Sequence, residues 1–175
     1  MTIAAALTAA LSYAVRPLTP ADLPALHALC LGNTAYYAHT TLRPTTENLR
    51  ADLTALPPGK TMRDKHFLGL FDDSGLLAAL DVITSYPAED AAWVGWLILR
   101  ADRQGQGLGS AVATALWRCL AEAGYTQARL AVLEGNEGAW RFWQRQGFYP
   151  DGESQTTDMG VARPMTKRLT RRFLE

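Results

Sequence analysis

Three glycines at alternate positions, Gly105, Gly107 and Gly109, stand between an apolar run and a helical pattern. Glycine lets the backbone turn sharply and lets a ligand approach without a clash against a Cβ atom. At the start of a helix, the unpaired N–H groups and the positive end of the helix dipole form a site for an anion. The segment therefore predicts a phosphate-binding loop. The alternative is a glycine-rich turn that binds no ligand.

Two common phosphate loops fit this segment poorly. A Walker loop requires a lysine followed by serine or threonine, and residues 104–110 contain no lysine. A dinucleotide fingerprint that began at Gly105 would require a third glycine at position 110, which is Ser110. A nucleotide-binding domain is therefore the weakest interpretation.

A third kind of loop fits better. The segment Gln104-x-x-Gly107-x-Gly109 resembles the coenzyme A pyrophosphate loop of the GNAT superfamily of N-acetyltransferases. A second stretch, at the same gap from the loop as in the family, is similar to the family's next strand and helix: Leu130-Ala131-Val132, then Asn136-x-x-Ala139-x-x-Phe142-Trp143-x-x-x-Gly147-Phe148. The resemblance is strong over residues 91–150 and looser over 13–90, and residues 1–12 lie outside it.

The resemblance implies both a fold and a function. The fold would be a single α/β (α+β) domain with a mixed, mostly antiparallel central sheet flanked by helices. The function would be that of an N-acetyltransferase, with acetyl-CoA as co-substrate and direct attack by a primary amine. The acceptor would be a small-molecule or peptide amine, and polyamines, amino acids, antibiotics, peptide N-termini and protein lysines all remain open.

The same resemblance assigns residues to the coenzyme. The backbone of Leu97 and Leu99 would pair with the pantetheine arm like an added strand, and the amides from Gly105 to Ser110 would hold the pyrophosphate. The amide of Ile98 or Leu99 would stabilise the thioester oxyanion. The full set is Leu97, Ile98, Leu99, Gln104, Gly105, Gln106, Gly107, Leu108, Gly109, Ser110, Asn136 and Trp143. Asn136 would bond the pantetheine or the thiol region, and it can also cap a helix.

Two catalytic positions depart from the family. The family often has a tyrosine at the position of Trp143 to protonate the leaving thiolate, and indole N–H is too weak an acid, so Trp143 is expected to be a channel wall. The family's frequent mid-strand carboxylate base is replaced by Gly95 and Trp96. Asp81 on the preceding strand and Tyr86 near the strand entrance are the candidate catalytic residues. The alternative for Asp81 is an outward-facing strand residue.

Aromatic residues supply the candidate acceptor site. Tyr36, Tyr37 and Trp96 are predicted to bind the substrate, because the first helix–loop–helix region covers the acceptor mouth in the family and aromatic rings suit an amine. His39 lies in the same loop and can line the site. Packing against the core is the alternative for each of these side chains.

The surrounding pattern predicts the elements that position these residues. Strands are expected at 13–16, 67–71, 76–83, 91–99, 128–133, 148–150 and 164–169, and helices from 19, over 46–56, from 108 and from 136. The first helix is expected to bury Leu23, Leu26, Cys30 and Leu31, and residues 33–43 to form a loop. The strand 91–99 is almost unbroken in apolar residues and is expected to be central, with both faces covered. Residues 1–12 are an N-terminal extension, disordered or docked, and 13–175 the N-acetyltransferase domain.

Composition limits the partners. The 175 residues carry a formal net charge of zero, so no nucleic-acid partner is expected. No apolar run has the length of a membrane span, which predicts no membrane and a cytoplasmic location. The two cysteines lack metal-ligand spacing, so no metal is expected, and a homodimer is left open. Since Trp143 and Gly95 weaken the catalytic pattern, the second interpretation is a non-catalytic coenzyme A-binding regulatory or interaction module.

Overall fold

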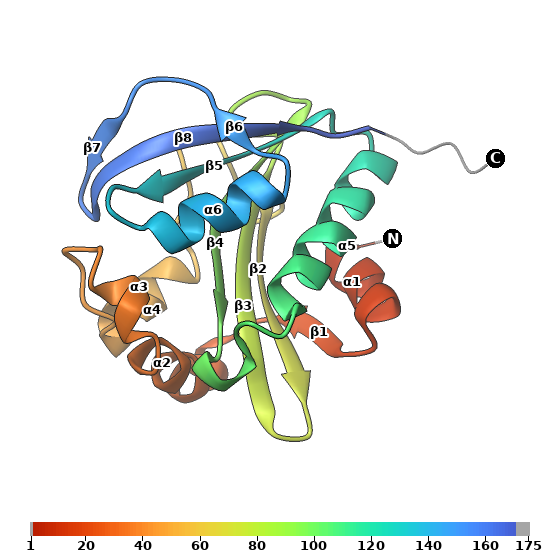
Figure 1. The fold of residues 1–175 in the computed structure, drawn as a ribbon. Coiled ribbons are helices and arrows are strands. Elements are labelled where there is room, and N and C mark those ends of the chain that lie inside the picture. Colours follow the sequence, from red (N-terminus) through yellow and green to blue (C-terminus); the bar gives the residue numbers. More distant parts are fainter. Residues whose placement is uncertain (1, 171–175) are drawn as a thin grey trace.

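The computed structural model describes residues 2–170 and contains one eight-stranded sheet (Figure 1). Its strand order is β1-β2-β3-β4-β5-β8-β6, and β7 pairs with β8. The strands are β1 (Ala14–Pro17), β2 (Lys65–Asp72), β3 (Gly75–Thr84), β4 (Ala91–Leu99), β5 (Gln127–Leu133), β6 (Tyr149–Pro150), β7 (Gln155–Thr157) and β8 (Gly160–Arg168). Only the β4–β5 pair is parallel among the described strands, which confirms the predicted mixed, mostly antiparallel sheet.

Helices cover both faces of this sheet (Figure 1). They are α1 (Ile3–Leu11), α2 (Leu23–Leu31), α3 (Thr34–Tyr37), α4 (Thr46–Asp52), α5 (Leu108–Glu122) and α6 (Glu137–Arg145), with short 3₁₀ turns at Pro20–Asp22 and Ala101–Arg103. The main core packs α1, α5 and α6 against the sheet, and a second core packs α2 and α4 against the opposite face. The apolar stripes of these helices are buried where they meet the sheet.

Strands β4 and β5 separate along their length. Their parallel pairing joins Ala91 to Gln127 and ends where Trp93 pairs with Arg129, whereas β4 stays paired with β3 up to Leu99. The second half of β4 therefore has one open edge. The strand is central, as predicted, but its faces are only partly covered, since Gly95 is exposed.

Several boundaries differ from the sequence-based expectation. In α2, Leu29 is buried and Leu31 is 56% exposed, so the predicted stripe was wrong at its last residue. Helix α4 ends at Asp52 rather than at Leu56. The predicted loop 33–43 contains α3, and β7 was not predicted. Elements of three or four residues are too short to produce a periodic pattern in the sequence.

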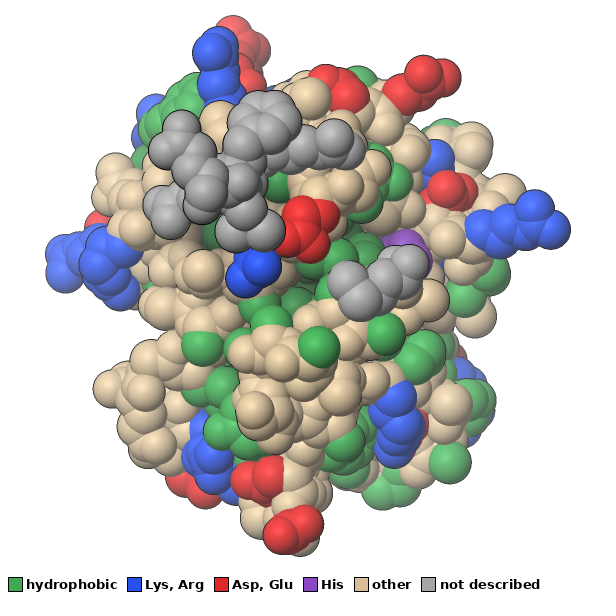
Figure 2. Space-filling view, turned by 90° about the vertical axis from the view of Figure 1, so that its right-hand side faces the viewer, with side chains coloured by type: hydrophobic (Ala, Val, Ile, Leu, Met, Phe, Trp, Pro, Cys, Tyr) green, Lys and Arg blue, Asp and Glu red, His purple; other side chains and the backbone are tan. Residues whose placement is uncertain are grey.

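The start of the chain is a docked helix. Thr2 caps α1 by accepting a hydrogen bond from the Ala5 amide at 3.2 Å, and Leu7 is completely buried in the main core. Figure 2 views the side of the molecule that carries α1 and α5, where acidic and basic side chains are interspersed with hydrophobic ones. Residues 1–12 are thus docked as far as the structure describes them, and the domain boundary at residue 13 stays a prediction.

No helix within residues 2–170 has the length and apolarity to cross a membrane.

Candidate active site

The glycine loop opens onto free space at the start of α5. Gly105 and Gly107 have φ angles of 70° and 84°, in the left-handed region that favours glycine. A Cβ atom added at either glycine would have no other atom within 4 Å. The first helical bond runs from the Ala111 amide to the Gly107 carbonyl, so the amides of Leu108 to Ser110 have no partner within the helix. This geometry suits a bound anion.

A cleft of about 660 Å³ extends from this loop along the open edge of β4. Its other walls are α3 and α6. It is lined by Asn33, Ala35, Tyr36, His39, Leu97, Ile98, Leu99, Gln104, Gly105, Gly107, Gly109, Ser110, Asn136, Gly138, Ala139, Phe142, Trp143 and Arg145. All of the residues predicted for the coenzyme are among them except Gln106 and Leu108. The Gln106 side chain donates to the Asp102 carbonyl at 2.8 Å, and Leu108 is buried in the main core.

The backbone of β4 offers hydrogen-bonding groups to this cleft. The Arg100 amide donates to the Leu77 carbonyl of β3 at 2.7 Å. Because successive residues of a strand direct their amide and carbonyl groups to opposite edges, those of Leu97 and Leu99 point away from β3, toward the cleft. The Leu99 carbonyl already accepts hydrogen bonds from Asn33 and Gln104, so Leu99 offers only its amide. The amide and carbonyl groups of Ile98 point toward β3. Of the two amides predicted for the oxyanion, only that of Leu99 therefore faces the cleft.

A smaller cavity of about 100 Å³ continues the cleft between the separated strands β4 and β5. It is lined by Tyr36, Val94, Gly95, Trp96, Leu97, Leu130, Ala131, Val132, Leu133, Asn136, Ala139 and Trp143. Five residues line both cavities: Tyr36, Leu97, Asn136, Ala139 and Trp143. We call these five residues the junction.

Two of the junction residues also have structural roles. The Asn136 side chain accepts a hydrogen bond from the Ala139 amide at 3.1 Å and so caps α6. Trp143 is 8% exposed and packs edge-on against Phe142 and Phe148 at ring-centroid distances of 4.8 and 5.5 Å. Trp143 is therefore mainly a core residue with one side on the cleft, which suits a channel wall.

Asp81 lines neither cavity and lies beside Gly95 of the smaller one, in a buried ion pair. Both carboxylate oxygens are 3.0 Å from Lys65 Nζ, and the side chains of Asp81 and Lys65 are 19% and 2% exposed. Burial raises the pKa of Asp81, and the positive charge of Lys65 opposes the rise. A Cβ atom at Gly95 would lie 3.2 Å from Asp81 Oδ2. The carboxylate thus occupies the space beside Gly95, and Asp81 is not the outward-facing residue of the alternative interpretation.

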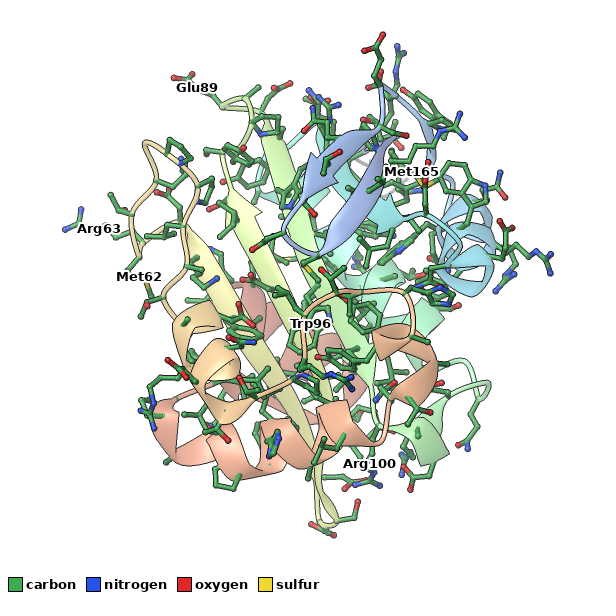
Figure 3. All side chains as sticks on the ribbon, turned by 90° about the vertical axis from the view of Figure 1, so that its left-hand side faces the viewer. Met62, Arg63, Glu89, Trp96, Arg100 and Met165 are labelled. Carbon is green, nitrogen blue, oxygen red and sulfur yellow. The ribbon has the colours of Figure 1, made fainter. Side chains whose placement is uncertain are left out.

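The predicted aromatic residues separate into two groups. Tyr36 and Trp96 line the smaller cavity, with their ring centroids 6.5 Å apart, and Figure 3 shows Trp96 over the middle of the sheet. Tyr37 packs against Tyr36 at 4.9 Å but lines neither cavity. Burial raises the pKa of Tyr36 to about 12, so its hydroxyl stays protonated near neutral pH.

Trp96 carries an unsatisfied polar atom. Its buried indole nitrogen has no hydrogen-bond partner of good geometry among the described residues. The Tyr36 hydroxyl lies near the indole N–H, which opposes the rise in the pKa of Tyr36. The two groups do not have the geometry of a hydrogen bond. Trp96 therefore places a buried donor without a partner beside the smaller cavity, which other atoms of the residue line.

Tyr86 is placed away from the cleft. It belongs to the turn between β3 and β4, where its ring packs against Trp93 at 6.1 Å, and it lines neither cavity. Glu89 of the same turn lies at the end of the sheet, far from Trp96 (Figure 3). A catalytic role for Tyr86 stays a prediction, which this placement does not favour.

Sequence reasoning gave no site role to six residues that line the larger cavity: Asn33, Ala35, Gly138, Ala139, Phe142 and Arg145. His39, which was predicted for the acceptor site, lines the larger cavity and not the smaller one. Arg145 stands in the last turn of α6, where a basic residue ordinarily serves the helix dipole, so its sequence position gave no signal. Asn33 follows an apolar helical stripe, and only the folded chain brings it to β4. Within residues 2–170, no group of three or more His, Cys, Asp or Glu side chains could hold a metal ion.

Known families and solved structures share this architecture. The model of the acetyltransferase (GNAT) family matches residues 34–148, more than half of the chain, whereas no curated protein sequence matches. Acetyltransferase from Thermus thermophilus is 28% identical, with a TM-score of 0.71, and the match covers 91% of this chain and 99% of that chain.

Two further structures share the fold. PaiA N-acetyltransferase from Thermoplasma acidophilum, solved in complex with coenzyme A, is 20% identical with a TM-score of 0.64, over 90% of this chain and 99% of that chain. The ribosomal-protein-S18-alanine N-acetyltransferase from Escherichia coli is 18% identical with a TM-score of 0.64, over 92% and 96%. The family match, together with the predicted glycine loop and sheet, leads to one conclusion: the chain belongs to the acetyltransferase (GNAT) family and is an N-acetyltransferase.

Proposed function

We propose that this chain transfers the acetyl group of acetyl-CoA to a primary amine at the junction of the two cavities. One observation carries the proposal. The anion-binding loop at the start of α5 opens into a cleft that leads, along a free strand edge, to the point where β4 and β5 separate. A long donor with phosphates at one end and a reactive thioester at the other suits this path.

The donor site is built mainly from backbone groups. The amides of the loop, from Gly105 to Ser110, hold the pyrophosphate at the helix N-terminus, and Arg145 supplies a positive charge on the same cleft. The edge of β4 at Leu97 and Leu99 pairs with the pantetheine arm. No side chain fills the space in front of Gly105 or Gly107, which is what close approach of a phosphate requires.

Transfer requires attack, oxyanion stabilisation and two proton movements. The neutral amine attacks the thioester carbonyl carbon and the carbonyl oxygen becomes negative. The carbon–sulfur bond then breaks, and the released thiolate takes a proton from water. Among the cleft-facing amides of β4, that of Leu97 belongs to the junction and that of Leu99 does not. We therefore place the oxyanion donor at Leu97, rather than at Ile98 or Leu99 as expected from the sequence.

Asp81 is the proposed general base. It accepts the proton of the attacking amine, through water, from the acceptor face of the sheet. Its carboxylate fills the space beside Gly95, so the mid-strand carboxylate that β4 lacks is supplied by the neighbouring strand. Burial keeps the pKa of Asp81 above its ordinary value, which makes it a better proton acceptor than an exposed aspartate.

The proposed acceptor is a primary amine of a small molecule or a peptide, in contact with Tyr36 and Trp96. Both rings line the smaller cavity, where an aromatic wall suits the body and charge of an amine. A homodimer and a cytoplasmic location stay predictions.

Thiol release tests the proposal. Purified protein is mixed with acetyl-CoA and a panel of polyamines, amino acids, lysine peptides and peptides with free N-termini. We expect release of coenzyme A only with certain amines, and tighter binding of acetyl-CoA than of ATP or NAD. Tight binding of acetyl-CoA without turnover on any amine would contradict catalysis and support the coenzyme A-binding module. Tighter binding of ATP or NAD would contradict the donor site.

A further inference from the structure

We propose that Asn33, before α3, is a positioning residue that presets the donor site by fixing both the end of β4 and the start of the glycine loop. This inference rests on the donor site proposed above. Asn33 is only 6% exposed, although it stands in a connection between helices. A buried polar side chain is costly unless its hydrogen-bonding groups are satisfied, so the partners of Asn33 show its role.

The Asn33 side chain reaches across the molecule instead of capping its own helix. Asn33 holds the N-cap position of α3 but makes no side-chain cap bond there. Its Nδ2 donates to the Leu29 carbonyl at 2.8 Å and to the Leu99 carbonyl at 2.9 Å. The first bond holds Asn33 to α2, and the second holds it to the last residue of β4, which is 66 positions away in the sequence.

Gln104 completes the arrangement from the glycine loop. Its Nε2 donates to Asn33 Oδ1 at 2.6 Å and to the Leu99 carbonyl at 3.1 Å. The Leu99 carbonyl therefore accepts two hydrogen bonds, which uses both of its lone pairs. Asn33 uses both of its donor hydrogens and its acceptor oxygen. The three residues form a closed triangle of hydrogen bonds.

This triangle joins two parts of the donor site. Leu99 ends the strand edge proposed for the pantetheine arm, and Gln104 begins the loop proposed for the pyrophosphate. The link between them is the 3₁₀ turn Ala101–Arg103, and the triangle closes across that turn. One donor molecule must contact both parts at once, so holding them in one arrangement before binding lowers the cost of ordering them.

The triangle also reaches the acceptor side. Asn33 directly precedes α3, and Tyr36 of that helix belongs to the junction. A side chain that fixes the start of α3 against β4 therefore fixes the wall that faces the acetyl group. Asn33 touches neither reacting atom, so it acts through Leu99, Gln104 and α3.

The test compares Asn33→Ala with a matched control. Thr166→Val removes the side-chain hydrogen bond of another buried polar residue, from Thr166 to Asp151 at 2.9 Å, on β8 and outside both cavities. We expect both variants to lower the melting temperature. Only Asn33→Ala should raise the Kd and KM for acetyl-CoA, by about 10-fold, with kcat at saturating donor reduced less than about threefold. An unchanged Kd in Asn33→Ala would overturn the inference.

A double-mutant cycle with Gln104→Ala then separates positioning from general destabilisation. If Asn33 acts through Gln104, the double variant should bind acetyl-CoA about as weakly as the weaker single variant. If the fold increase in Kd of the double variant equals the product of the two single-variant increases, the coupling is contradicted.

Two further variants keep the outcomes apart. Asn33→Asp keeps an acceptor for Gln104 but loses both donors, and it should bind at least as weakly as Asn33→Ala because its carboxylate faces two carbonyl oxygens. If the Asn33 variants do not fold, Gln104→Ala alone tests the triangle, and normal donor affinity there overturns it. Normal affinity in the Asn33 variants, with binding lost in Gly107→Val, would leave the donor site standing and remove only this inference.

Discussion

The donor half and the acceptor half of this cleft are built in different ways. The donor half consists of the β4 edge and the loop 104–110, which are adjacent in the sequence and present mainly backbone groups. The proposed acceptor half combines side chains from three strands and one helix. Tyr36 and Trp96 line the smaller cavity, and the ion pair of Lys65 and Asp81 lies beside it without lining it. A backbone site needs only the right conformation, whereas a side-chain site depends on which residues the fold happens to bring together.

The two halves also differ in charge. The loop from Gly105 to Ser110 contains no ionisable side chain. The acceptor half contains the buried pair of Lys65 and Asp81, and Asp52 of α4 faces it. The pKa of Asp52 is raised by burial and then by the negative charge of Asp81. Changes of pH should therefore affect the acceptor half much more than donor binding.

The largest expected effect breaks the donor half by adding a side chain. Gly107→Val places a branched side chain in the open space before α5 and should raise the Kd for acetyl-CoA at least about 100-fold, measured by calorimetry. The backbone strain of a non-glycine residue at positive φ costs about 1–3 kcal/mol. Gly59→Val is the matched control, because Gly59 has a φ of 78° and equally open surroundings but lies far along the chain in another loop. Equal loss of donor binding in both variants would contradict the loop assignment.

The donor half was largely predictable from the sequence, for a physical reason. Three glycines before a helical pattern specify a conformation locally, and that conformation is the site. The open edge of β4 followed only from the family resemblance, since separation of β4 from β5 is a property of the whole sheet. The placement of Asn33 could not be predicted, because its partners Leu99 and Gln104 are 66 and 71 residues away and no local pattern encodes that distance.

The acceptor half was predictable in its candidates but not in their arrangement. The sequence gave Tyr36 and Tyr37 the same predicted role. Both rings pack against the second core, and only the turn of α3 brings Tyr36, and not Tyr37, to the cavities. Asp81 was singled out as a carboxylate in an apolar strand. Its partner Lys65 pairs with it across β2 and β3, and the space beside Gly95 depends on the register of β3 and β4. Register is set by long-range pairing, which a single strand does not specify.

The second prediction tests whether the acceptor half carries the chemistry. Asp81→Asn removes the proposed base and should lower kcat/KM by about 100-fold while the Kd for acetyl-CoA stays unchanged. The base is active when deprotonated, so activity falls as the pH drops through the pKa of Asp81. That pKa is raised, and the fall should begin above the range of an ordinary aspartate.

The pH profile supplies the control for this prediction. In Asp81→Asn, the fall in kcat/KM at low pH that comes from protonation of Asp81 should disappear. The increase in kcat/KM that comes from deprotonation of the acceptor amine should remain. The substitution would leave the Lys65 charge buried without a counter-charge, so Lys65→Met combined with Asp81→Asn checks that lost activity is not lost folding. A fall at low pH that persists in both variants would assign the base to another group.

A smaller effect should distinguish the two neighbouring tyrosines. Tyr36→Leu changes a wall of both cavities and should raise the KM for the acceptor by about 10-fold, with the Kd for acetyl-CoA changed less than about threefold. Tyr37→Leu is the control, because the Tyr37 ring lines neither cavity. Tyr37→Leu should lower stability without changing the KM for the acceptor. Similar KM changes in the two variants would mean that α3 acts as a unit and that the Tyr36 side chain has no separate role.

The smallest expected effect concerns how α2, the helix that precedes α3, is held to the sheet. Asp22, before α2, accepts two hydrogen bonds from the Arg16 guanidinium of β1, at 2.7 and 2.9 Å. These bonds, with those from Thr19, hold the pKa of Asp22 well below its usual range. Because the folded state favours the ionised carboxylate, Asp22 contributes to the free energy of unfolding above about pH 4, the ordinary pKa of an aspartate. That contribution is lost as the pH falls further.

Asp22→Asn should therefore lower the free energy of unfolding at pH 7 by about 1 kcal/mol, a modest value because Arg16 is half exposed. Urea denaturation at pH 7 and at about pH 2 measures the difference between the variant and the original chain, and we expect it to shrink at the lower pH. Acetyl-CoA affinity at pH 7 should stay the same, since neither Arg16 nor Asp22 lines the cleft. A stability difference that is the same at both pH values would show that the charge of Asp22 does not hold α2. A loss of donor affinity would instead show that the two halves are mechanically coupled through the sheet.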